Sequence, residues 1–302
     1  MKAMIAGGTG LIGSALAESL LEDGCQVSII SRNPDRVDSR YKPVSWEESS
    51  LIDELMTSTA VINLAGASLA GNNPTQMRWT PKRKEAILSS RRTAGRKLVQ
   101  AIKGMERVPE VFLQASAIGY YGNQGVEPVD ENSSPGNDFL AKVCLDWEAS
   151  TAELEEIGVR RLVVRIGLVL SSEGGLLPTL ALPFRFFIGG RIGSGQQYLS
   201  WIHIQDLVEG IKYLIENPNC QGAYNLSAPN PATNQVFSTH LGNALQKPVW
   251  LPVPSLLLKG FLGEAATLAL EGRPVYPTRL LAAGYPFIYP DLDDSLIDLI
   301  GR

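Results

Sequence analysis

The sequence predicts an α/β protein built on a parallel sheet that helices cover on both faces. Short apolar runs alternate with segments whose apolar residues recur at helical spacing, and a glycine-rich turn joins the first run to the first such segment. A strand, a helix and a second parallel strand connect by a right-handed crossover, which places helices over the sheet. We therefore expect a Rossmann-type doubly wound parallel sheet, followed by a smaller C-terminal α/β substrate domain.

Each element of the first part follows from its pattern. Residues 2–6 form an apolar run, and Ile12, Leu16 and Leu20 recur every four residues along one face of the next segment. Strands are expected at residues 2–6, 27–30, 60–64, 111–115 and 162–166. Helices are expected at residues 11–21, 82–102 and 139–157.

The pattern loosens after residue 170, where glycine and proline residues fall close together. Because these residues interrupt regular structure, we divide the chain into a Rossmann domain at 1–170 and a smaller substrate or lid domain at 171–302. The second part is expected to hold strands at residues 198–202 and 223–226 and helices at residues 205–216, 234–245 and 255–270. Residues 192–226 are expected to return to the first domain.

Composition excludes several classes of protein. The 27 basic and 31 acidic residues give a net charge of 27 − 31 = −4, which argues against a general binder of nucleic acids or anionic membranes. No apolar run is long enough to predict a membrane span. Three scattered cysteines without a C-x-x-C motif indicate a reducing compartment, so we expect a cytoplasmic protein, or a plastid stromal one if the source is a plant. Two histidines and no H-E-x-x-H motif predict no metal site.

The strongest motif is GGTGLIG at residues 7–13, between the first predicted strand and the first predicted helix. A glycine loop in this place lets the backbone approach a pyrophosphate, and the helix N-terminus offers free N–H groups and a positive dipole end. Its context favours a dinucleotide site over an ordinary turn. The residues expected to contact the cofactor here are Gly7, Thr9, Gly10, Leu11, Ile12 and Gly13.

The end of the second strand indicates which dinucleotide is bound. Arg32 lies 19 residues after Gly13, where an NAD-binding protein would have an acidic residue for the ribose 2′-hydroxyl. A guanidinium group cannot accept that hydrogen bond, but it can donate several to a 2′-phosphate. Ser31 could add a hydroxyl contact. The sequence therefore predicts NADP(H) as the cofactor.

Motifs along nearly the whole chain resemble the extended and atypical short-chain dehydrogenase/reductases, and more narrowly their "epimerase family protein" branch, which includes bacterial and plastid cell-division-inhibitor-like members. The matching stretches are GGTGLIG at 7–13, SRNP at 31–34, VINLAGA at 61–67, SAIGYYG at 116–122, DFLAKVCLDWE at 138–148, GGRIGSGQQYLSWIHIQD at 189–206 and LEGRPVYPTRLLAAGY at 270–285. The resemblance implies further cofactor contacts at Leu64, Ala65, Gly66, Arg91, Leu168 and Val169.

The catalytic couple of that superfamily, Tyr-x-x-x-Lys, is missing. None of the nine tyrosines has a lysine four residues later, and alignment on Glu148 puts Leu140 and Cys144 in the two places. Alignment on Lys142 puts Asp138 in the tyrosine place, so neither register restores the couple.

Other side chains are candidates for replacing the missing phenol and for contacting a substrate. Ser116 ends a predicted strand, in a register that is uncertain by one residue against Ala117, and Tyr120 and Tyr121 follow it; we predict these three as the acid–base residues. Structural packing is an equal alternative for each tyrosine. Candidate substrate contacts are Trp79, Arg165, Gln197, Trp201 and His203.

Residues 78–107 hold ten basic and two acidic residues, a net charge of 10 − 2 = +8. Such a segment could bind nucleic acid or an acidic protein. No aromatic residues are interleaved along its helix for base stacking, so a solvated helix face with one or two cofactor-phosphate contacts is favoured, and no nucleic-acid partner is expected.

A third function, a nucleic-acid or protein-binding module that uses the basic helix and has a vestigial nucleotide site, is disfavoured by the intact glycine loop and Arg32. Two functions remain. The first is an NADPH-dependent oxidoreductase or epimerase-like enzyme acting on an unknown small molecule with a degenerate catalytic site. The second is a non-catalytic NADPH-binding sensor that signals to a protein partner, which the cell-division-inhibitor-like relatives suggest by analogy.

Overall fold

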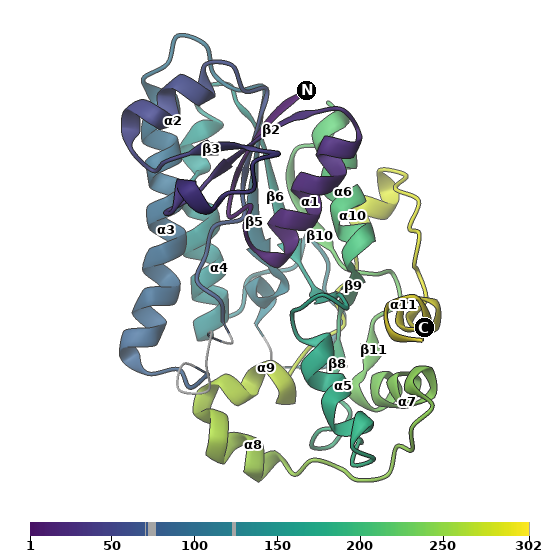
Figure 1. Cartoon of the computed structure of the whole chain (residues 1–302). Coiled ribbons are helices and arrows are strands. Elements are labelled where there is room, and N and C mark those ends of the chain that lie inside the picture. Colours follow the sequence, from purple (N-terminus) through teal and green to yellow (C-terminus); the bar gives the residue numbers. More distant parts are fainter. Residues whose placement is uncertain (70, 72–76, 123–124, 302) are drawn as a thin grey trace.

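The structure, a computed structural model, describes residues 1–69, 71, 77–122 and 125–301. Its centre is a seven-stranded sheet in the order β10-β6-β5-β4-β1-β2-β3, with every neighbouring pair parallel (Figure 1). The strands are β1 (Lys2–Ala6), β2 (Gln26–Ile30), β3 (Lys42–Val44), β4 (Ala60–Asn63), β5 (Val111–Ala117), β6 (Arg160–Ile166) and β10 (Gly222–Leu226). The order reverses between β1 and β4, and ligands of doubly wound sheets bind at the carboxyl ends of the strands beside such a reversal.

Helices cover both faces of the sheet because successive side chains of each strand point to opposite faces. Ala3 and Ile5 of β1 pack in one cluster with α1 (Leu11–Glu22) and α6 (Ile204–Glu216). Met4 and Ala6 pack in another cluster with α2 (Glu48–Leu55) and α3 (Pro81–Lys103). The helix α4 (Phe139–Ala149) lies beside α3 (Figure 1). The predicted doubly wound parallel sheet is confirmed.

A smaller unit is built from the chain after β6, around a core that includes Phe184, Trp201 and Phe237. Its strands form two short pairs, β7 with β9 in parallel and β8 with β11 in antiparallel. Its elements are β7 (Leu168–Leu170), α5 (Leu177–Arg185), β8 (Tyr198–Leu199), β9 (Trp201–His203), β11 (Ala232–Thr233), α7 (Asn234–Leu245), α8 (Ser255–Leu262), α9 (Thr267–Leu270) and α11 (Leu292–Ile300). The helix α10 (Thr278–Ala282) instead packs against β10 of the main sheet, where Leu280 joins the core.

Several predicted boundaries differ from the structure. The helix expected at 139–157 ends at Ala149 and is followed by a short 3₁₀ helix, Ala152–Leu154. The helix expected at 255–270 is interrupted at Gly263, whose φ of +59° lies in the left-handed region that favours glycine. The strand expected at 198–202 is two short strands outside the main sheet, so only α6 and β10 of residues 192–226 rejoin the first domain.

Seven strands and α-helices of the described residues were not predicted at all, namely β3, β7, β11, α2, α5, α10 and α11. Within the described ranges, no helix combines the length and apolarity that crossing a membrane requires.

Candidate functional site

The glycine loop between β1 and α1 is shaped by two close backbone approaches, at Gly7 and Gly13. Gly7 has a φ of +84°, and a Cβ atom there would lie 2.8 Å from the carbonyl oxygen of Leu64. A Cβ atom at Gly13 would lie 2.2 Å from the carbonyl oxygen of Gly7. At Gly10 a Cβ atom would make only one ordinary contact, 3.4 Å from the carbonyl oxygen of Gly7, and would otherwise face the open space in front of the loop.

That open space lies at the N-terminus of α1, which no side chain caps and whose first turn has no acidic residue. Thr9 is exposed, and Leu11 and Ile12 are half-buried in the first turn. Unsatisfied N–H groups and the positive end of the helix dipole attract phosphate groups. The geometry therefore fits a pyrophosphate beside Gly10.

The two residues after β2 lie at the same edge of the sheet, because β2 pairs in parallel with β1. The hydroxyl of Ser31 accepts a hydrogen bond from the backbone N–H of Asn33 at 3.1 Å. Arg32 is exposed and has no hydrogen bond or ion pair with any other described residue. Its guanidinium group is free to bind an anion.

Arg91 of α3 is a buried cation beside the loop after β4. It donates hydrogen bonds to the carbonyl oxygens of Ala67 and Ile87 at 3.0 and 3.1 Å, and its guanidinium lies 4.7 Å from the ring centre of Trp147. It has no carboxylate partner among the described residues, and its Nε atom has no hydrogen-bond partner. Burial lowers the pKa of Arg91 to about 10. A buried, incompletely satisfied cation at this edge fits an anionic ligand.

The rest of the loop after β4 is held by backbone contacts. The N–H of Leu64 donates to the carbonyl oxygen of Ala6 at 2.8 Å, and the N–H of Ala65 donates to the side chain of Asn63 at 3.2 Å. A Cβ atom at Gly66 would lie 3.0 Å from the Arg91 guanidinium carbon, so glycine leaves room for that side chain.

A cavity of about 240 Å³ lies at the carboxyl ends of β5 and β6, where the smaller unit meets the sheet. Gly167 and Leu168 form one wall, and residues 268–275 of the C-terminal unit form another. Val169, the next predicted contact, continues β7. Most of the lining is apolar: Leu69, Ile118, Leu140, Val143, Cys144, Trp147, Ile166, Leu168, Leu199, Leu268 and Val275. The polar exceptions include Arg91, Tyr198, Ser200, Glu271 and Arg273.

One face of α4 forms a wall of the cavity, and the register aligned on Glu148 would place the missing tyrosine and lysine on this face. Leu140, Val143, Cys144 and Trp147 follow helical spacing and all line the cavity. The Cys144 thiol donates to the carbonyl oxygen of Ala117 at 3.5 Å, and burial raises its pKa to about 11. This wall therefore offers a neutral thiol and apolar side chains in place of a phenol and an ammonium group.

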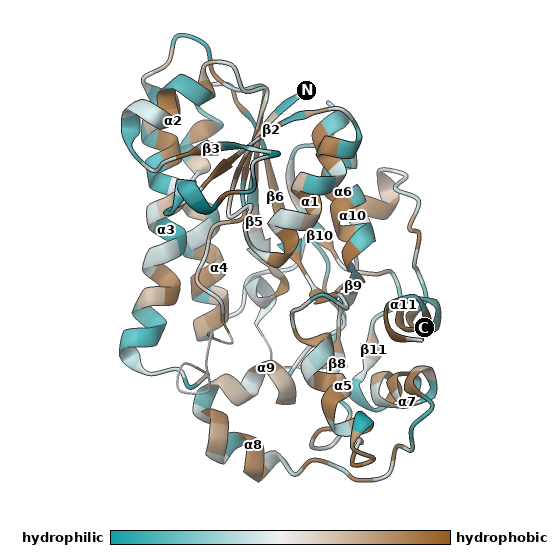
Figure 2. Cartoon of the chain, viewed as in Figure 1, coloured by the Kyte–Doolittle hydropathy of each residue, from teal (hydrophilic) through white to brown (hydrophobic). Residues whose placement is uncertain are grey.

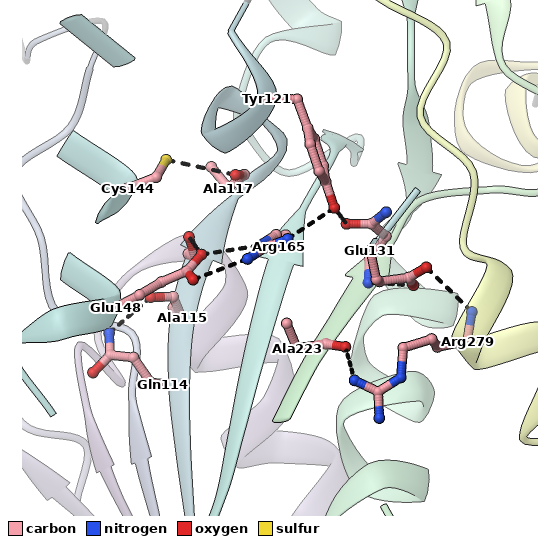
Figure 3. A network of polar contacts seen from close by, with 12 residues as sticks. Gln114, Ala115, Ala117, Tyr121, Glu131, Cys144, Glu148, Arg165, Ala223 and Arg279 are labelled. Atoms are coloured by element: carbon pink, nitrogen blue, oxygen red, sulfur yellow. Dashed lines mark hydrogen bonds and ion pairs between the residues drawn. The ribbon is translucent and has the colours of Figure 1, made fainter. Parts of the chain in front are cut away.

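The three predicted acid–base residues lie around a buried ion pair instead. Arg165 binds Glu148 through two hydrogen bonds of 3.0 and 3.1 Å (Figure 3), and Ser116 donates to the same carboxylate at 2.6 Å. Arg165 also donates to the hydroxyl of Tyr121 at 3.0 Å, and its guanidinium lies 3.4 Å from the ring centre of Tyr120. Among described residues, neither Ser116 nor the two tyrosines belong to the cavity lining.

The hydroxyl of Tyr121 is fully engaged in this network. It accepts from Arg165 (Figure 3), and it donates to Asn225 of β10 at 2.7 Å. Burial raises the pKa of Tyr121 to about 12. The Tyr120 hydroxyl has no hydrogen-bond partner among the described residues, so it is the one predicted phenol that remains available.

The other predicted substrate contacts have structural roles in the packed units. Trp79 and Trp201 donate their indole N–H groups to backbone carbonyl oxygens at 3.0 and 3.1 Å. Gln197 donates to two carbonyl oxygens at 3.0 and 2.9 Å. His203 caps α6 by accepting from the backbone N–H of Gln205 at 3.1 Å, and burial lowers its pKa. None of these four belongs to the cavity lining within the part of the chain that the structure describes.

Glu271 and Arg273 are the charged cavity residues that sequence reasoning missed. Arg273 makes only long contacts, of 3.3 to 3.5 Å, to the carbonyl oxygens of Tyr121 and Glu127, and no described carboxylate pairs with it. The signal available was the LEGRP stretch at 270–274, which carries the resemblance but gives no hint of its position at the sheet.

Part of the basic charge of α3 is neutralised locally. Lys84 pairs with Glu264 at 2.5 Å, and Lys103 pairs with Glu153.

Over the described ranges, no group of three or more His, Cys, Asp and Glu residues could hold a metal ion.

The glycine loop, the uncapped helix and the free arginine at the reversal of a parallel sheet define a dinucleotide-binding Rossmann protein. A model of the NAD dependent epimerase/dehydratase family matches residues 3–227, and the chain belongs to this family. Residues 253–299 match a second model, a domain of unknown function called DUF1731. The resemblance drawn from the motifs is thus confirmed.

Individual relatives match over almost the whole chain. The Arabidopsis thaliana "Epimerase family protein SDR39U1 homolog, chloroplastic" is 38% identical, over 98% of this chain and 86% of its own. A Staphylococcus aureus protein, "Epimerase family protein MW0731", is 36% identical over 98% of both chains. The crystal structure of human epimerase family protein SDR39U1 (isoform2) with NADPH is similar, with a TM-score of 0.88, 33% identity and 99% coverage of both chains.

Proposed function

We propose that this chain binds NADP(H) and uses it to reduce a small, largely apolar carbonyl or quinone compound. The observation that carries the proposal is the apolar cavity beside Gly167 and Leu168, at the edge of the sheet that holds the glycine loop. The human relative was solved with NADPH, which supports the choice of cofactor.

The residues present fit this cofactor. Residues 7–13 and the N-terminus of α1 would hold the pyrophosphate, and Arg32 with Ser31 would hold the 2′-phosphate. Residues 64–66 and Arg91 would border the ribose and phosphates, and Leu168 and Val169 would border the nicotinamide. When bound, NADPH would supply a hydride to the cavity.

The cavity's own side chains then limit the substrate. Its apolar walls favour an acceptor with few polar groups, and Arg273 provides a cation near which negative charge on an oxygen atom can develop. Of the predicted acids, Tyr120 is the phenol whose hydroxyl is not engaged. It lies outside the cavity lining but directly follows Ile118 and Gly119, which line it, so we propose Tyr120 as the proton donor to a substrate that extends past these two residues. A phenol without a neighbouring lysine acts more readily as an acid than as a base at neutral pH, which favours reduction over oxidation.

The test is transfer of deuterium from NADPH labelled at C4 to members of a panel of aldehydes, ketones and quinones. Tyr120→Phe should slow the transfer at least tenfold, whereas Tyr121→Phe is the matched control for loss of a phenol that the network already holds. Equal activity of wild type and Tyr120→Phe would refute the assignment of the donor.

A second function is favoured by the wall of α4. In the register aligned on Glu148, Leu140 and Cys144 take the places of the catalytic couple, and both line the cavity, which suits a non-catalytic NADPH sensor. Tight NADPH binding without label transfer to any member of the panel would support the sensor and contradict the reductase.

A further inference from the structure

The smaller unit carries an exposed apolar surface on its outer end. Leu256 and Phe261 of α8 are 82% and 79% exposed, and Phe186 and Trp250 are 68% and 65% exposed. Figure 2 shows α8 as a mainly hydrophobic helix at the end of the molecule opposite the N-terminus. We call this the end surface; its members are Leu182, Phe186, Phe187, Ile188, Trp250, Leu251, Leu256, Leu257 and Phe261.

The end surface comes from two chain segments, residues 182–191 and 247–261. It is continuous because hydrogen bonds hold these two segments side by side. The Trp250 indole donates to the carbonyl oxygen of Phe187 at 2.8 Å, and the backbone N–H of Trp250 donates to Gly189 at 3.1 Å. The N–H of Val253 donates to the carbonyl oxygen of Arg191 at 2.8 Å, and α8 begins two residues later. None of the eight residues of α8 is buried, although its sequence, SLLLKGFL, is mostly apolar.

The backbone holds aromatic rings outward at a conformational cost. Phe187 has a φ of +61°, a left-handed conformation that is unusual for a bulky residue. The residue is 54% exposed, and the centre of its ring lies 4.0 Å from the ammonium group of Lys247. A strained backbone that exposes an aromatic ring is a reason to look for a ligand of the surface.

The charge of these segments is opposite to that of the chain. Residues 182–191 and 247–261 contain Arg185, Arg191, Lys247 and Lys259 and no acidic residue, a net charge of +4. The remainder of the chain therefore carries −4 − 4 = −8. The overall negative charge, which argued against an anionic membrane as a partner, does not describe this surface.

We propose that the end surface binds the face of an anionic lipid bilayer, with its aromatic and leucine side chains in the headgroup region. Exposed Phe, Trp and Leu side chains beside Lys and Arg are the composition of proteins that lie on a bilayer without crossing it. A second copy of the chain fits less well, because a two-fold contact would bring four basic residues from each copy together. The proposal does not depend on the proposed reaction.

The test is flotation of the full chain with vesicles of phosphatidylcholine alone or mixed with phosphatidylglycerol. Wild type should float with the mixed vesicles, less with the neutral ones, and less again as salt is raised. One basic residue near an anionic bilayer strengthens binding about fivefold, so Arg185→Glu with Lys259→Glu should lower partitioning at least about 25-fold. Trp250→Ser with Phe261→Ser should abolish flotation, because it removes two of the apolar side chains that enter the headgroup region. An unchanged circular dichroism spectrum would show that each variant folds.

The matched control is Arg96→Glu with Lys97→Glu, which changes the net charge equally on the exposed surface of α3, away from the end that contacts the segment after α8. This control should float like wild type. Failure of wild type to float, or an equal loss in the control, would overturn the proposal. A dimer in sedimentation experiments that Phe261→Ser dissociates would also overturn it, and would assign the end surface to a second copy.

Discussion

Two buried arginines near the candidate site should respond to the same substitution in opposite ways. Arg91 and Arg165 are 8% and 5% exposed, but Arg165 binds the carboxylate of Glu148, whereas Arg91 has no described carboxylate partner. If Arg91 is kept for an anionic ligand, its removal should weaken cofactor binding without unfolding the protein. If Arg165 is a structural cation, its removal should destabilise the fold.

The magnitudes follow from the surroundings of each side chain. The lowered pKa of Arg91, about 10, corresponds to roughly 3 kcal/mol that burial costs the cation at neutral pH. Two charge-assisted hydrogen bonds to carbonyl oxygens, at about 1.5 kcal/mol each, offset that cost. Arg91→Met should therefore change the free energy of unfolding by about 1 kcal/mol or less. Arg165→Met leaves the carboxylate of Glu148 buried without its partner and should cost about 3–5 kcal/mol.

The assay is urea unfolding of both variants and of wild type, with and without NADPH. Wild type should gain about 2.7 kcal/mol when the NADPH concentration is 100 times its Kd, and Arg91→Met should gain almost nothing at that concentration. Arg91 is protonated at pH 7 in both the folded and the unfolded protein, so burial of its charge lowers stability by the whole amount there. Because its pKa is lower in the folded protein than in the unfolded one, this loss of stability shrinks as the pH rises through 10. An Arg91→Met variant that loses 3 kcal/mol without NADPH, or that binds NADPH like wild type, would refute this account of the site.

The remaining predictions concern the cofactor and the buried network. Arg32→Glu should weaken NADPH binding by about 2–4 kcal/mol in calorimetric titration while NADH binding changes little; tighter binding of NADH than NADPH by wild type would contradict the choice of cofactor. Gly10→Val should abolish NADPH binding with an unchanged melting curve, because the new side chain fills the open space before the loop. Tyr121→Phe should destabilise the protein by about 1–3 kcal/mol in urea unfolding, since Asn225 and Arg165 each lose a buried partner; an unchanged midpoint would show that the hydroxyl is not needed.

The sheet could be predicted because its strands are buried on both faces and read as continuous apolar runs. The run at residues 2–6 is the whole of β1, and the following helix was located within one residue at each end. The strand β3 was missed because it has three residues at the edge of the sheet, with Lys42 and Pro43 exposed. The short helices of the smaller unit were missed or merged because tertiary packing, more than local pattern, sets their ends.

The cofactor loop could be located because its chemistry is local in sequence, whereas the cavity depends on which way each side chain points. Ser116 was chosen as the hydroxyl at the end of β5, but side chains alternate along a strand. The neighbouring Ala117 lines the cavity, and Ser116 donates to Glu148 instead. A difference of one residue at the strand end thus decides whether a hydroxyl reaches a substrate or an ion pair, and the motif alone does not determine it.

The sequence also does not show which basic residues are paired with a carboxylate in the folded protein. Arg91 and Arg165 look alike as basic residues in matching motifs, yet Glu148, 17 residues before Arg165, binds only one of them. Arg273 comes from the C-terminal unit, and the fold brings it to the carboxyl end of β5. Arg32, Arg91 and Arg273, which have no carboxylate partner among the described residues, extend from the glycine loop to the cavity, whereas the charge of Arg165 is neutralised by Glu148. An unpaired cation at the ligand-binding edge of the sheet stabilises bound negative charge and contributes little to folding. Substitution of any of these three arginines should therefore weaken ligand binding with little change in the free energy of unfolding.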